Sequence, residues 1–336
     1  MLAFLFACTV PLSDPTGLVA DARVLAVRAD PPEAEPGAEV QFTALYADKT
    51  GSLADAPLDW SFCTATRPVA ELGPIAQPCL DAYSEELAPI GQGISVAAAL
   101  PDDGCSQFGP NPPQAEEGAT GGKPADPDVT GGYYQPALVF VDDVPSTLVA
   151  ARIRCGIANV TQEDYVAWNT KYHDNANPEI GELALDSGSG FTTLPSDGSD
   201  SPPSVAAGAE VDLRVAWSEC PESGVCGDGI CSADEELTAC PEDCTTPAGC
   251  SGAESYILWN PDEKTLTTRR EAISATWFST DGSFSKLRNG RAGDDNATSV
   301  TNGWTAPDQP GEVWLGVVLR DERGGVNYEG YRLVVE

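Results

Sequence analysis

The sequence predicts an all-β protein built from two antiparallel β-sandwiches, and three observations support this fold class. Apolar and polar residues alternate with a period of two over many short segments, which is typical of half-buried strands. Gly and Pro, 33 and 28 of the 336 residues, separate these segments and predict frequent turns. A stretch in the first half of the chain recurs in the second half, which indicates two copies of one domain.

The repeat aligns residues 31–48 with residues 202–219 without a gap. Pro31 matches Pro202, an offset of 171 residues, and Gly-Ala-Glu-Val occurs in both copies. The apolar positions also coincide: Val40, Phe42, Ala44 and Tyr46 match Val211, Leu213, Val215 and Trp217. We therefore expect a strand at the same place in each domain.

The first domain is expected at residues 21–160. Its other strands are predicted at 22–30, 58–63, 94–100, 136–143 and 147–157. Residues 101–135 hold many Gly and Pro and few apolar side chains, so we expect a long surface loop tied at Cys105. Trp60 lies on the third strand and is expected to fill the core.

The second domain is expected at residues 177–336. Its other strands are predicted at 179–186, 272–279, 312–321 and 327–336. A hairpin turn at 322–325 joins the last two strands, and residues 186–204 are expected to be a loop between strands. Trp277 occupies the third strand, where Trp60 lies in the first domain.

A short helix is predicted in the connecting segment, residues 161–176. Thr161 and Asp164 form a loose capping box at its start. Tyr165, Trp168 and Tyr172 follow at helical spacing, and we expect this aromatic stripe to dock the helix on the first sandwich. A ligand site is the alternative, but such spacing more often marks core contacts.

A cysteine-rich insertion is predicted at residues 220–250 of the second domain. Tyr46 and Trp60 are separated by 13 residues, whereas Trp217 and Trp277 are separated by 59. The surplus contains the spacing C-x4-C-x8-C-x3-C, and so few apolar residues that disulfides must hold it. Cys220 and Cys250 stand at its two ends and are expected to pair with each other. Zinc is the competing explanation, which the lack of a C-x2-C pair disfavours.

Acidic residues crowd the same insertion. Asp228, Asp234, Glu235 and Asp243 could supply hard oxygen ligands, so calcium is the one cofactor that the sequence suggests. Solvated charge is the alternative, because acidic clusters arise by chance in so acidic a chain.

The amino terminus is an apolar run that ends at Cys8. Leu5-Phe6-Ala7-Cys8 resembles the lipobox of bacterial lipoproteins, which implies a signal remnant at 1–8, lipidation of Cys8 and a linker at 9–20. The run lacks a basic region, so we expect the natural start to lie upstream of Met1. Thr9 after the cysteine implies the outer membrane under the family's sorting pattern.

The number of cysteines supports this interpretation. Of 11 cysteines, removing Cys8 leaves ten, which is an even number and suits an oxidising compartment. The residues expected in disulfides are Cys63, Cys79, Cys105, Cys155, Cys220, Cys226, Cys231, Cys240, Cys244 and Cys250.

Taken together, these features resemble Gram-negative bacterial surface lipoproteins with Ig-like domains and an inserted CGDGxC…CPxDC module. The resemblance implies two immunoglobulin-like antiparallel β-sandwiches, a connecting helix and a disulfide-rich insertion. It also implies a location in the cell envelope, periplasmic or surface-exposed.

The composition excludes several function classes. The 18 Lys and Arg against 52 Asp and Glu give a net charge of −34, which repels nucleic acid and anionic membrane surfaces. His173 is the single histidine, and its polar neighbours predict a solvated position rather than a catalytic one. No nucleophile elbow, phosphate loop or dinucleotide motif is present, so we expect no catalytic residues.

The sequence therefore predicts a non-enzymatic, lipid-anchored envelope protein that acts as a structural or adhesion module. Its partner is an envelope protein or a glycan that the sequence does not identify, and it meets the membrane through its lipid alone. The alternative is a carbohydrate-binding or enzyme-accessory module, in which Tyr133, Tyr134 and Trp304 stack on sugars.

Overall fold

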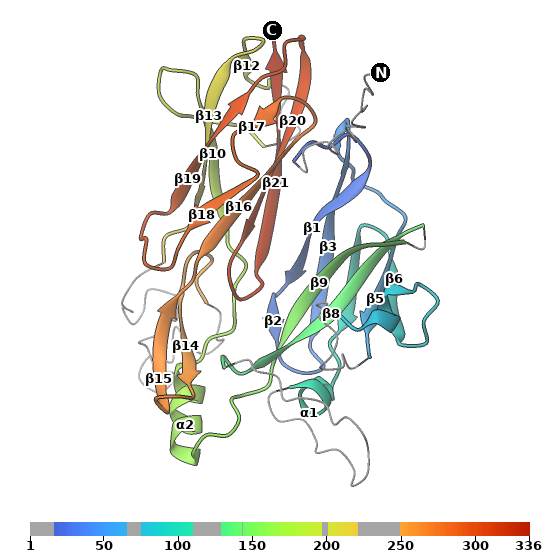
Figure 1. Cartoon of the computed structure of the whole chain (residues 1–336), viewed down its shortest axis with the longest axis vertical. Coiled ribbons are helices and arrows are strands. Elements are labelled where there is room, and N and C mark those ends of the chain that lie inside the picture. Colours follow the sequence, from blue (N-terminus) through green and yellow to red (C-terminus); the bar gives the residue numbers. More distant parts are fainter. Residues whose placement is uncertain (1–16, 66–74, 110–128, 143, 197–200, 221–248) are drawn as a thin grey trace, which may run out of the picture.

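The computed structural model describes residues 17–65, 75–109, 129–142, 144–196, 201–220 and 249–336. Two β-sandwiches lie side by side, and a helix and a long hairpin project from one end (Figure 1). The all-β class and the pair of immunoglobulin-like sandwiches are confirmed.

The first sandwich packs a four-stranded sheet on a five-stranded sheet. The four-stranded sheet contains β1 (Arg23–Asp30), β3 (Glu39–Asp48), β4 (Gly51–Ser52) and β7 (Ser95–Ala99). The other follows the order β2 (Glu33–Ala34), β9 (Val144–Arg154), β8 (Gly132–Val141), β5 (Leu58–Cys63) and β6 (Leu87–Gln92). Phe42 and Trp60 meet in the core with ring centroids 6.2 Å apart.

The second sandwich repeats this arrangement. One sheet follows the order β11 (Thr192–Thr193), β10 (Ile180–Asp186), β13 (Glu210–Trp217), β19 (Ser299–Thr305) and β17 (Ser283–Phe284). The other follows the order β12 (Ser204–Val205), β21 (Val326–Val335), β20 (Gly311–Arg320), β16 (Ile273–Ser279) and β18 (Arg288–Arg291). Trp277 and Trp304 fill its core.

The sequence repeat corresponds to a repeat of topology. β2 pairs in parallel with β9, and β12 pairs in parallel with β21. β3 and β13 are the strands that the sequence repeat aligns, and their alternating apolar residues are buried. Trp60 and Trp277 lie on corresponding central strands, each 1% exposed, as the sequence predicts.

The structure differs from the sequence prediction in residues 101–135. Part of this expected loop is ordered: α1 (Gly104–Phe108) forms there, and β8 begins at Gly132 rather than at 136. Phe108 stacks on Tyr133 at 5.1 Å, and a disulfide joins Cys105 to Cys155. These contacts bury apolar area that a composition argument does not anticipate.

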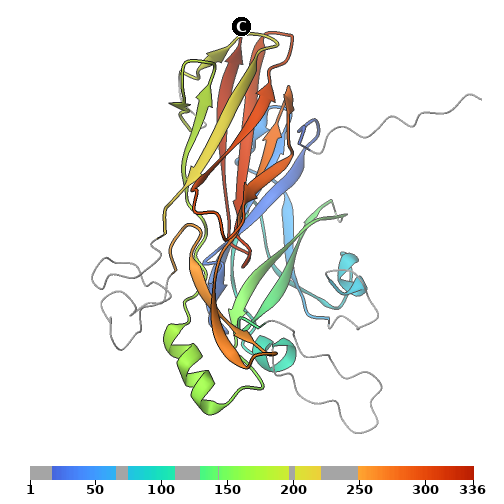
Figure 2. The same cartoon turned by 60° about the vertical axis from the view of Figure 1, so that its left-hand side comes forward.

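A second difference is the hairpin of β14 (Ser255–Asn260) and β15 (Thr265–Arg270). These strands lie between Trp217 and Trp277 but after residue 250, where the predicted insertion ends, in a segment for which the sequence predicts no strand. The hairpin extends away from the second sandwich and runs alongside the connecting helix (Figure 2).

The connecting helix, α2 (Gln162–Lys171), forms as predicted, and the Thr161 side chain accepts a hydrogen bond from the Asp164 backbone N–H at 3.1 Å. Its docking partner differs from the expectation. Trp168 and Tyr172 pack with Ile257 and Trp259 of β14 as well as with Ile157. The aromatic stripe therefore connects the helix mainly to the hairpin, which the sequence did not predict.

Candidate functional site: the joint between the sandwiches

An apolar interface holds the two sandwiches together. The outer face of β1 and β3 packs on the outer face of β16, β20 and β21. The buried residues of this interface are Val19, Ala26, Leu45, Ala47, Phe278, Trp314, Val318 and Val326. Sheet faces that would otherwise be solvated thus become a second, smaller core between the domains.

Trp314 is the central anchor of this interface. Its indole ring lies where Cβ atoms on Gly51, Gly316 and Gly330 would stand 2.8, 2.3 and 2.6 Å from ring atoms. Gly51 comes from the first sandwich and the other two from the second. The three glycines leave a slot that a side chain at any of them would fill.

The first described residues also belong to the joint. Leu18 pairs with Ser279 of β16 in a parallel bridge, and the Val19 N–H donates to the Ser279 carbonyl at 2.8 Å. Val19 itself is fully buried between the domains. Residues 17–19, which the sequence placed in a linker, are therefore fixed on the second sandwich before β1 starts in the first.

Beside the apolar interface lies a buried ionic group that we call the joint cluster. It consists of Glu33, Arg152, Glu254, Glu271 and Arg323. Glu33 and Arg152 come from β2 and β9 of the first sandwich. Glu254 and Glu271 flank the β14–β15 hairpin, and Arg323 lies in the turn between β20 and β21. Side-chain exposure is at most 6% for every member.

Glu33 connects the two halves of the cluster. Its Oε1 accepts a hydrogen bond from Arg152 Nε at 2.9 Å, and its Oε2 lies 3.9 Å from Arg323 Nη1. The Tyr172 hydroxyl and the Asn175 backbone N–H also donate to this carboxylate. A residue from β2 of the first sandwich is thus held by groups from both sandwiches and from the connecting segment.

Arg323 is satisfied in a similar way. Its Nε donates to Glu271 Oε1 at 2.7 Å, and its Nη2 donates to Glu254. Its Nη1 donates to the His173 carbonyl at 3.1 Å, and its guanidinium lies 4.8 Å from the centroid of the Tyr256 ring. Hydrogen bonds of this kind offset the cost of removing a guanidinium from water.

Two asparagines of the connecting segment join the domains around the cluster. Asn177 donates to the Ala29 carbonyl and accepts from the Val326 N–H, both at 2.8 Å. Asn175 Nδ2 lies 3.2 Å from the Asp321 carboxylate. The segment between α2 and β10 therefore fixes the geometry of the joint and is not a free linker.

The cluster contains more carboxylates than guanidiniums, three against two. Glu271 Oε2 accepts no hydrogen bond from the described residues. Burial, with nearby acidic groups such as Asp321, raises the pKa of Glu271 well above its usual range. This shift favours the neutral form of Glu271, because a buried unpaired charge is far more costly than a neutral carboxyl group.

His173 contradicts the solvated position expected from its polar neighbours, since it is 6% exposed. Burial, and secondarily the charge of Arg323, lowers its pKa to about 4. The imidazole is therefore neutral at physiological pH. The sequence suggested a linker, but Arg323 of the turn between β20 and β21 donates to the carbonyl of this residue.

The neighbouring acidic groups shift in the opposite direction. Burial raises the pKa of Asp174 to about 7, even though Arg154 lies 3.3 Å from its carboxylate. Burial likewise raises the pKa of Asp321 to about 6, against the stabilising N–H groups of Gly325 and Arg323. The margin of the joint thus titrates within the physiological range.

This arrangement fixes the two sandwiches relative to each other. Arg323 is held by carboxylates from β2 and from both flanks of the hairpin, Arg152 is held by Glu33, and each carboxylate receives donors that fix its position. Separating the sandwiches would leave buried charges without partners, which costs about 3–5 kcal/mol for a single broken pair. The cluster therefore favours one relative orientation of the domains.

The predicted glycan-stacking residues do not come together. Trp304 is 1% exposed in the core of the second sandwich, so the expectation of an exposed ring is wrong. Strand alternation points its side chain inward. Tyr133 stacks on Phe108 in the first sandwich, and the Tyr134 hydroxyl donates to the Arg323 carbonyl at the joint.

A surface pocket of about 490 Å³ lies over the outer face of β13 and β19. Asp186, Glu210 and Asp212 line it together with Gly303 and Trp304. The Asp186 carboxylate accepts hydrogen bonds from the N–H groups of Gly188 and Gly190 at 2.7 and 2.9 Å, so it stabilises the turn that follows β10. The pocket is acidic, and Trp304, one of its lining residues, is 1% exposed and belongs to the core of the second sandwich.

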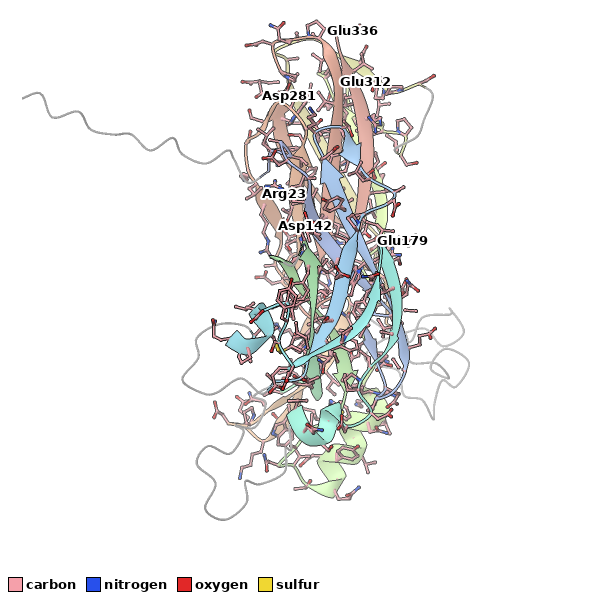
Figure 3. All side chains as sticks on the ribbon, turned by 90° about the vertical axis from the view of Figure 1, so that its right-hand side faces the viewer. Arg23, Asp142, Glu179, Asp281, Glu312 and Glu336 are labelled. Carbon is pink, nitrogen blue, oxygen red and sulfur yellow. A yellow bond between two sulfur atoms is a disulfide. The ribbon has the colours of Figure 1, made fainter. Side chains whose placement is uncertain are left out.

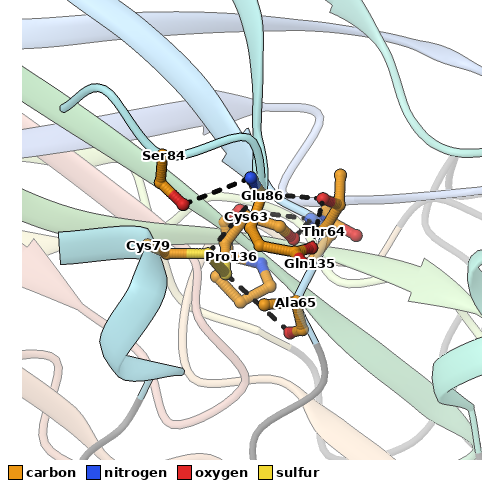
Figure 4. Close-up of a disulfide and its surroundings, with 8 residues drawn as sticks. All are labelled: Cys63, Thr64, Ala65, Cys79, Ser84, Glu86, Gln135 and Pro136. Atoms are coloured by element: carbon orange, nitrogen blue, oxygen red, sulfur yellow. Dashed lines mark hydrogen bonds between the residues drawn. A yellow bond between two sulfur atoms is a disulfide. The ribbon is translucent and has the colours of Figure 1, made fainter. Parts of the chain in front are cut away.

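Three disulfides are present among the described residues: Cys63–Cys79, Cys105–Cys155 and Cys220–Cys250. The first ties β5 to a short 3-10 helix, η1 (Gln77–Leu80) (Figure 4). The third joins the two ends of the insertion with a Cα separation of 5.8 Å, which is the pairing that the sequence predicts.

Other predicted site residues lie outside the described residues. These are Cys8, the inner cysteines Cys226, Cys231, Cys240 and Cys244, and the acidic residues Asp228, Asp234, Glu235 and Asp243. Within the part of the chain that the structure describes, no group of His, Cys, Asp and Glu side chains is arranged to hold a metal ion. The same part contains no helix with the length and apolar character needed to cross a membrane.

Sequence reasoning missed the joint cluster entirely. Glu33, Arg152 and Arg323 belong to no sequence motif. In a chain with 52 acidic residues, a single glutamate is not distinguishable from the others. One signal was available: Arg152 interrupts the apolar stretch predicted to be a strand at 147–157, whereas Glu33 lies in the turn predicted between two strands. Charged residues are rarely fully buried unless they are paired.

Comparison with known proteins finds no matching family and no matching curated protein. Among solved structures, the D00-D0 domain of intimin has 8% identity and a TM-score of 0.21, covering 93% of this chain and 100% of that chain. The adhesin InvE of Yersinia pseudotuberculosis has 9% identity and a TM-score of 0.21, covering 93% of this chain and 58% of that chain. The C-terminal domain of the AgI/II polypeptide BspA of Streptococcus agalactiae has 8% identity and a TM-score of 0.23, covering 92% and 99%. Scores this low carry no argument about function.

Proposed function

We propose that this chain is a non-enzymatic cell-envelope protein whose two immunoglobulin-like sandwiches act as one rigid structural or adhesion module, anchored by a lipid on Cys8 in the outer membrane. The observation that carries the proposal is the joint. A buried ionic cluster and an apolar interface fix the relative orientation of the sandwiches, which suits a module that presents a binding surface at a set position.

The placement of the chain ends supports a direction for such a module. The first described residues and the end of β21 lie at one end of the molecule, whereas α2 and the β14–β15 hairpin lie at the other (Figure 1). A lipid attached before Gly17 would therefore leave α2 and the hairpin facing away from the membrane. That distal end carries the exposed apolar side chains of Tyr165 and Val166, which an envelope protein or a glycan could contact.

The absence of enzyme activity is proposed from the state of the groups that could perform it. His173 is the only histidine of the chain, and it is buried with a lowered pKa. The buried carboxylates Glu33, Glu254 and Glu271 are engaged with guanidiniums. Groups held in this way stabilise a joint rather than perform general acid–base chemistry.

The anchor is tested by fractionating cells that express the protein with its full upstream signal. We expect it in outer membranes, and we expect Cys8→Ala to move it to the soluble fraction. Ser13→Ala is the matched control and should leave the distribution unchanged. A soluble distribution that does not respond to Cys8→Ala would overturn the anchor.

Rigidity is tested separately by spin labels on Ser95 of the first sandwich and Ser187 of the second, with distances measured by double electron–electron resonance. One narrow distance distribution is expected. A broad distribution in the unaltered chain would show that the sandwiches move independently, and would contradict the rigid module even if the anchor holds.

A further inference from the structure

One sheet face of the second sandwich carries positive charge in an otherwise acidic protein. It is the outer face of β16 and β18, beside the joint, and we call it the basic face. Its strand residues are Ser274, Thr276, Arg288 and Arg320, and Lys286 and Leu287 directly precede β18. Three of them are basic and none is acidic, although Asp and Glu outnumber Lys and Arg by 52 to 18 in the chain.

Strand register brings the basic residues together. Thr276 pairs with Arg288 on one side, and its neighbour Ser274 pairs with Arg320 on the other. Arg288 Nη2 donates to Ser274 Oγ at 2.9 Å, and Arg320 Nη1 lies 3.4 Å from Thr276 Oγ1. Hydroxyl groups are thus the side-chain partners of both guanidiniums.

The ion pairs of the described residues involve other bases, so no carboxylate there neutralises Lys286, Arg288 or Arg320. Arg320 is partly buried and close enough to Arg288 for mutual repulsion; burial first, and that repulsion second, lower its pKa. Two like charges brought together without a counter-charge cost stability. An anionic ligand would remove that cost.

A second observation indicates which anion this is. Leu287, between Lys286 and Arg288, is 42% exposed. An exposed apolar side chain flanked by bases is typical of surfaces that meet lipid headgroups, where apolar insertion and charge attraction add. Gly17 lies against this leucine, since a Cβ on Gly17 would be 3.1 Å from Leu287 Cδ1.

The position of Gly17 places the basic face near the proposed anchor. The nine steps of chain from Cys8 to Gly17 span at most about 30 Å when fully extended. The acidic residues Asp186, Glu210 and Asp212 lie on the other sheet of this sandwich. At physiological salt their repulsion is screened beyond about 8 Å, so the net charge of the chain does not decide what this face binds.

We propose that the basic face docks on the anionic phosphate headgroups of the membrane in which the N-terminus is anchored, and so sets the tilt of the module. This inference rests on the proposed function. It adds a second, reversible membrane contact to the lipid, whereas the overall composition alone predicts repulsion.

The test uses the full chain with Cys8→Ser, so that no lipid is attached, in co-sedimentation with vesicles. We expect binding to vesicles of phosphatidylcholine plus phosphatidylglycerol, weaker binding at higher salt, and little binding to phosphatidylcholine alone. Lys286→Gln with Arg288→Gln should lower the affinity by roughly 30-fold, about fivefold for each charge. Circular dichroism verifies that this surface variant is folded.

Arg214→Gln is the matched control. It removes one positive charge from the opposite sheet, where Arg214 pairs with Glu182 at 2.7 Å, and should leave vesicle binding unchanged. No binding to the phosphatidylglycerol vesicles, an equal loss with Arg214→Gln, or binding to soluble heparin but not to vesicles would each overturn the proposal. Because this protein carries no lipid, these outcomes are independent of the fractionation result for Cys8.

Discussion

The two sandwiches share one topology but differ at one corresponding pair of positions. In the first sandwich, the short strand β2 places Glu33 opposite Arg152 of β9, and both are buried. In the second, β12 places Ser204 opposite Val334 of β21, and Ser204 is exposed. Ser204 aligns with Glu33 in the sequence repeat.

This difference distinguishes the residues that a single sandwich needs to fold from the residues that pack the two sandwiches together. A serine and a valine suffice to close the second sandwich at this edge. The glutamate and arginine of the first sandwich are therefore not required by the fold, and their partners Tyr172, Asn175 and Arg323 all lie outside it. The same edge has become half of a joint between domains.

Replacing Glu33 is expected to cause the largest loss in the free energy of unfolding. Glu33→Ala leaves Arg152 and Arg323 buried without one of their carboxylates, so we expect a loss of about 3–5 kcal/mol in the free energy of unfolding. Ser204→Ala, at the aligned position, should change it by less than about 0.5 kcal/mol. Urea denaturation measures both, and equal losses would show that the two edges are equivalent after all.

Filling the slot around Trp314 gives the next largest effect. Gly330→Ala would place a Cβ 2.6 Å from Trp314 Nε1, and we expect overpacking to cost about 1–3 kcal/mol. Gly311→Ala lies on the adjacent strand β20 with open space around it and serves as the control. If Gly330→Ala is as stable as the control, Trp314 does not anchor the interface.

The pH dependence of the joint follows from groups that shift in opposite directions. His173 has a pKa of about 4 in the fold, against 6.5 for an ordinary histidine. Its contribution to stability is full above pH 6.5 and is lost as the pH falls to about 4. Asp321 has a pKa raised to about 6, so its contribution is present below pH 3.8 and is lost as the pH rises through 6.

His173 is the only histidine of the chain, so its ring resonances in a proton NMR spectrum need no assignment. We expect them to stay at the position of a neutral imidazole down to about pH 4. His173→Gln should flatten the stability profile between pH 4 and 6.5, while Lys264→Gln, on the exposed hairpin turn, should not. A midpoint near 6.5 would contradict the buried position.

Removing the insertion should give the smallest effect. The Cα atoms of Cys220 and Cys250 are 5.8 Å apart, so a short Gly/Ser linker in place of residues 221–248 spans the gap at little cost. We expect the unfolding transition of the second sandwich to survive in calorimetry. Loss of that transition would mean that the second sandwich needs the insertion in order to fold. The first sandwich has no counterpart to such a requirement.

The strands were largely predictable because their signal is local. Alternation places Val211, Leu213 and Val215 in the core whatever the rest of the chain does. The cap at Thr161 depends on a residue three positions away, and the Cys220–Cys250 bond follows from where an excursion leaves and rejoins a strand. The β14–β15 hairpin was missed, because no strand was predicted between the end of the insertion at residue 250 and residue 272.

The sequence by itself determined the fold class, the repeat, the buried tryptophans and the position of the connecting helix. Only the tertiary structure decided that Glu33, Arg152 and Arg323 would meet and that His173 would be buried. The physical reason is that periodicity reports which side of a strand is apolar. Charged residues such as Arg23 and Glu312 occur in both sandwiches (Figure 3). Periodicity does not report which two domains pack together, and only that packing determines whether a charged side chain is solvated or enclosed.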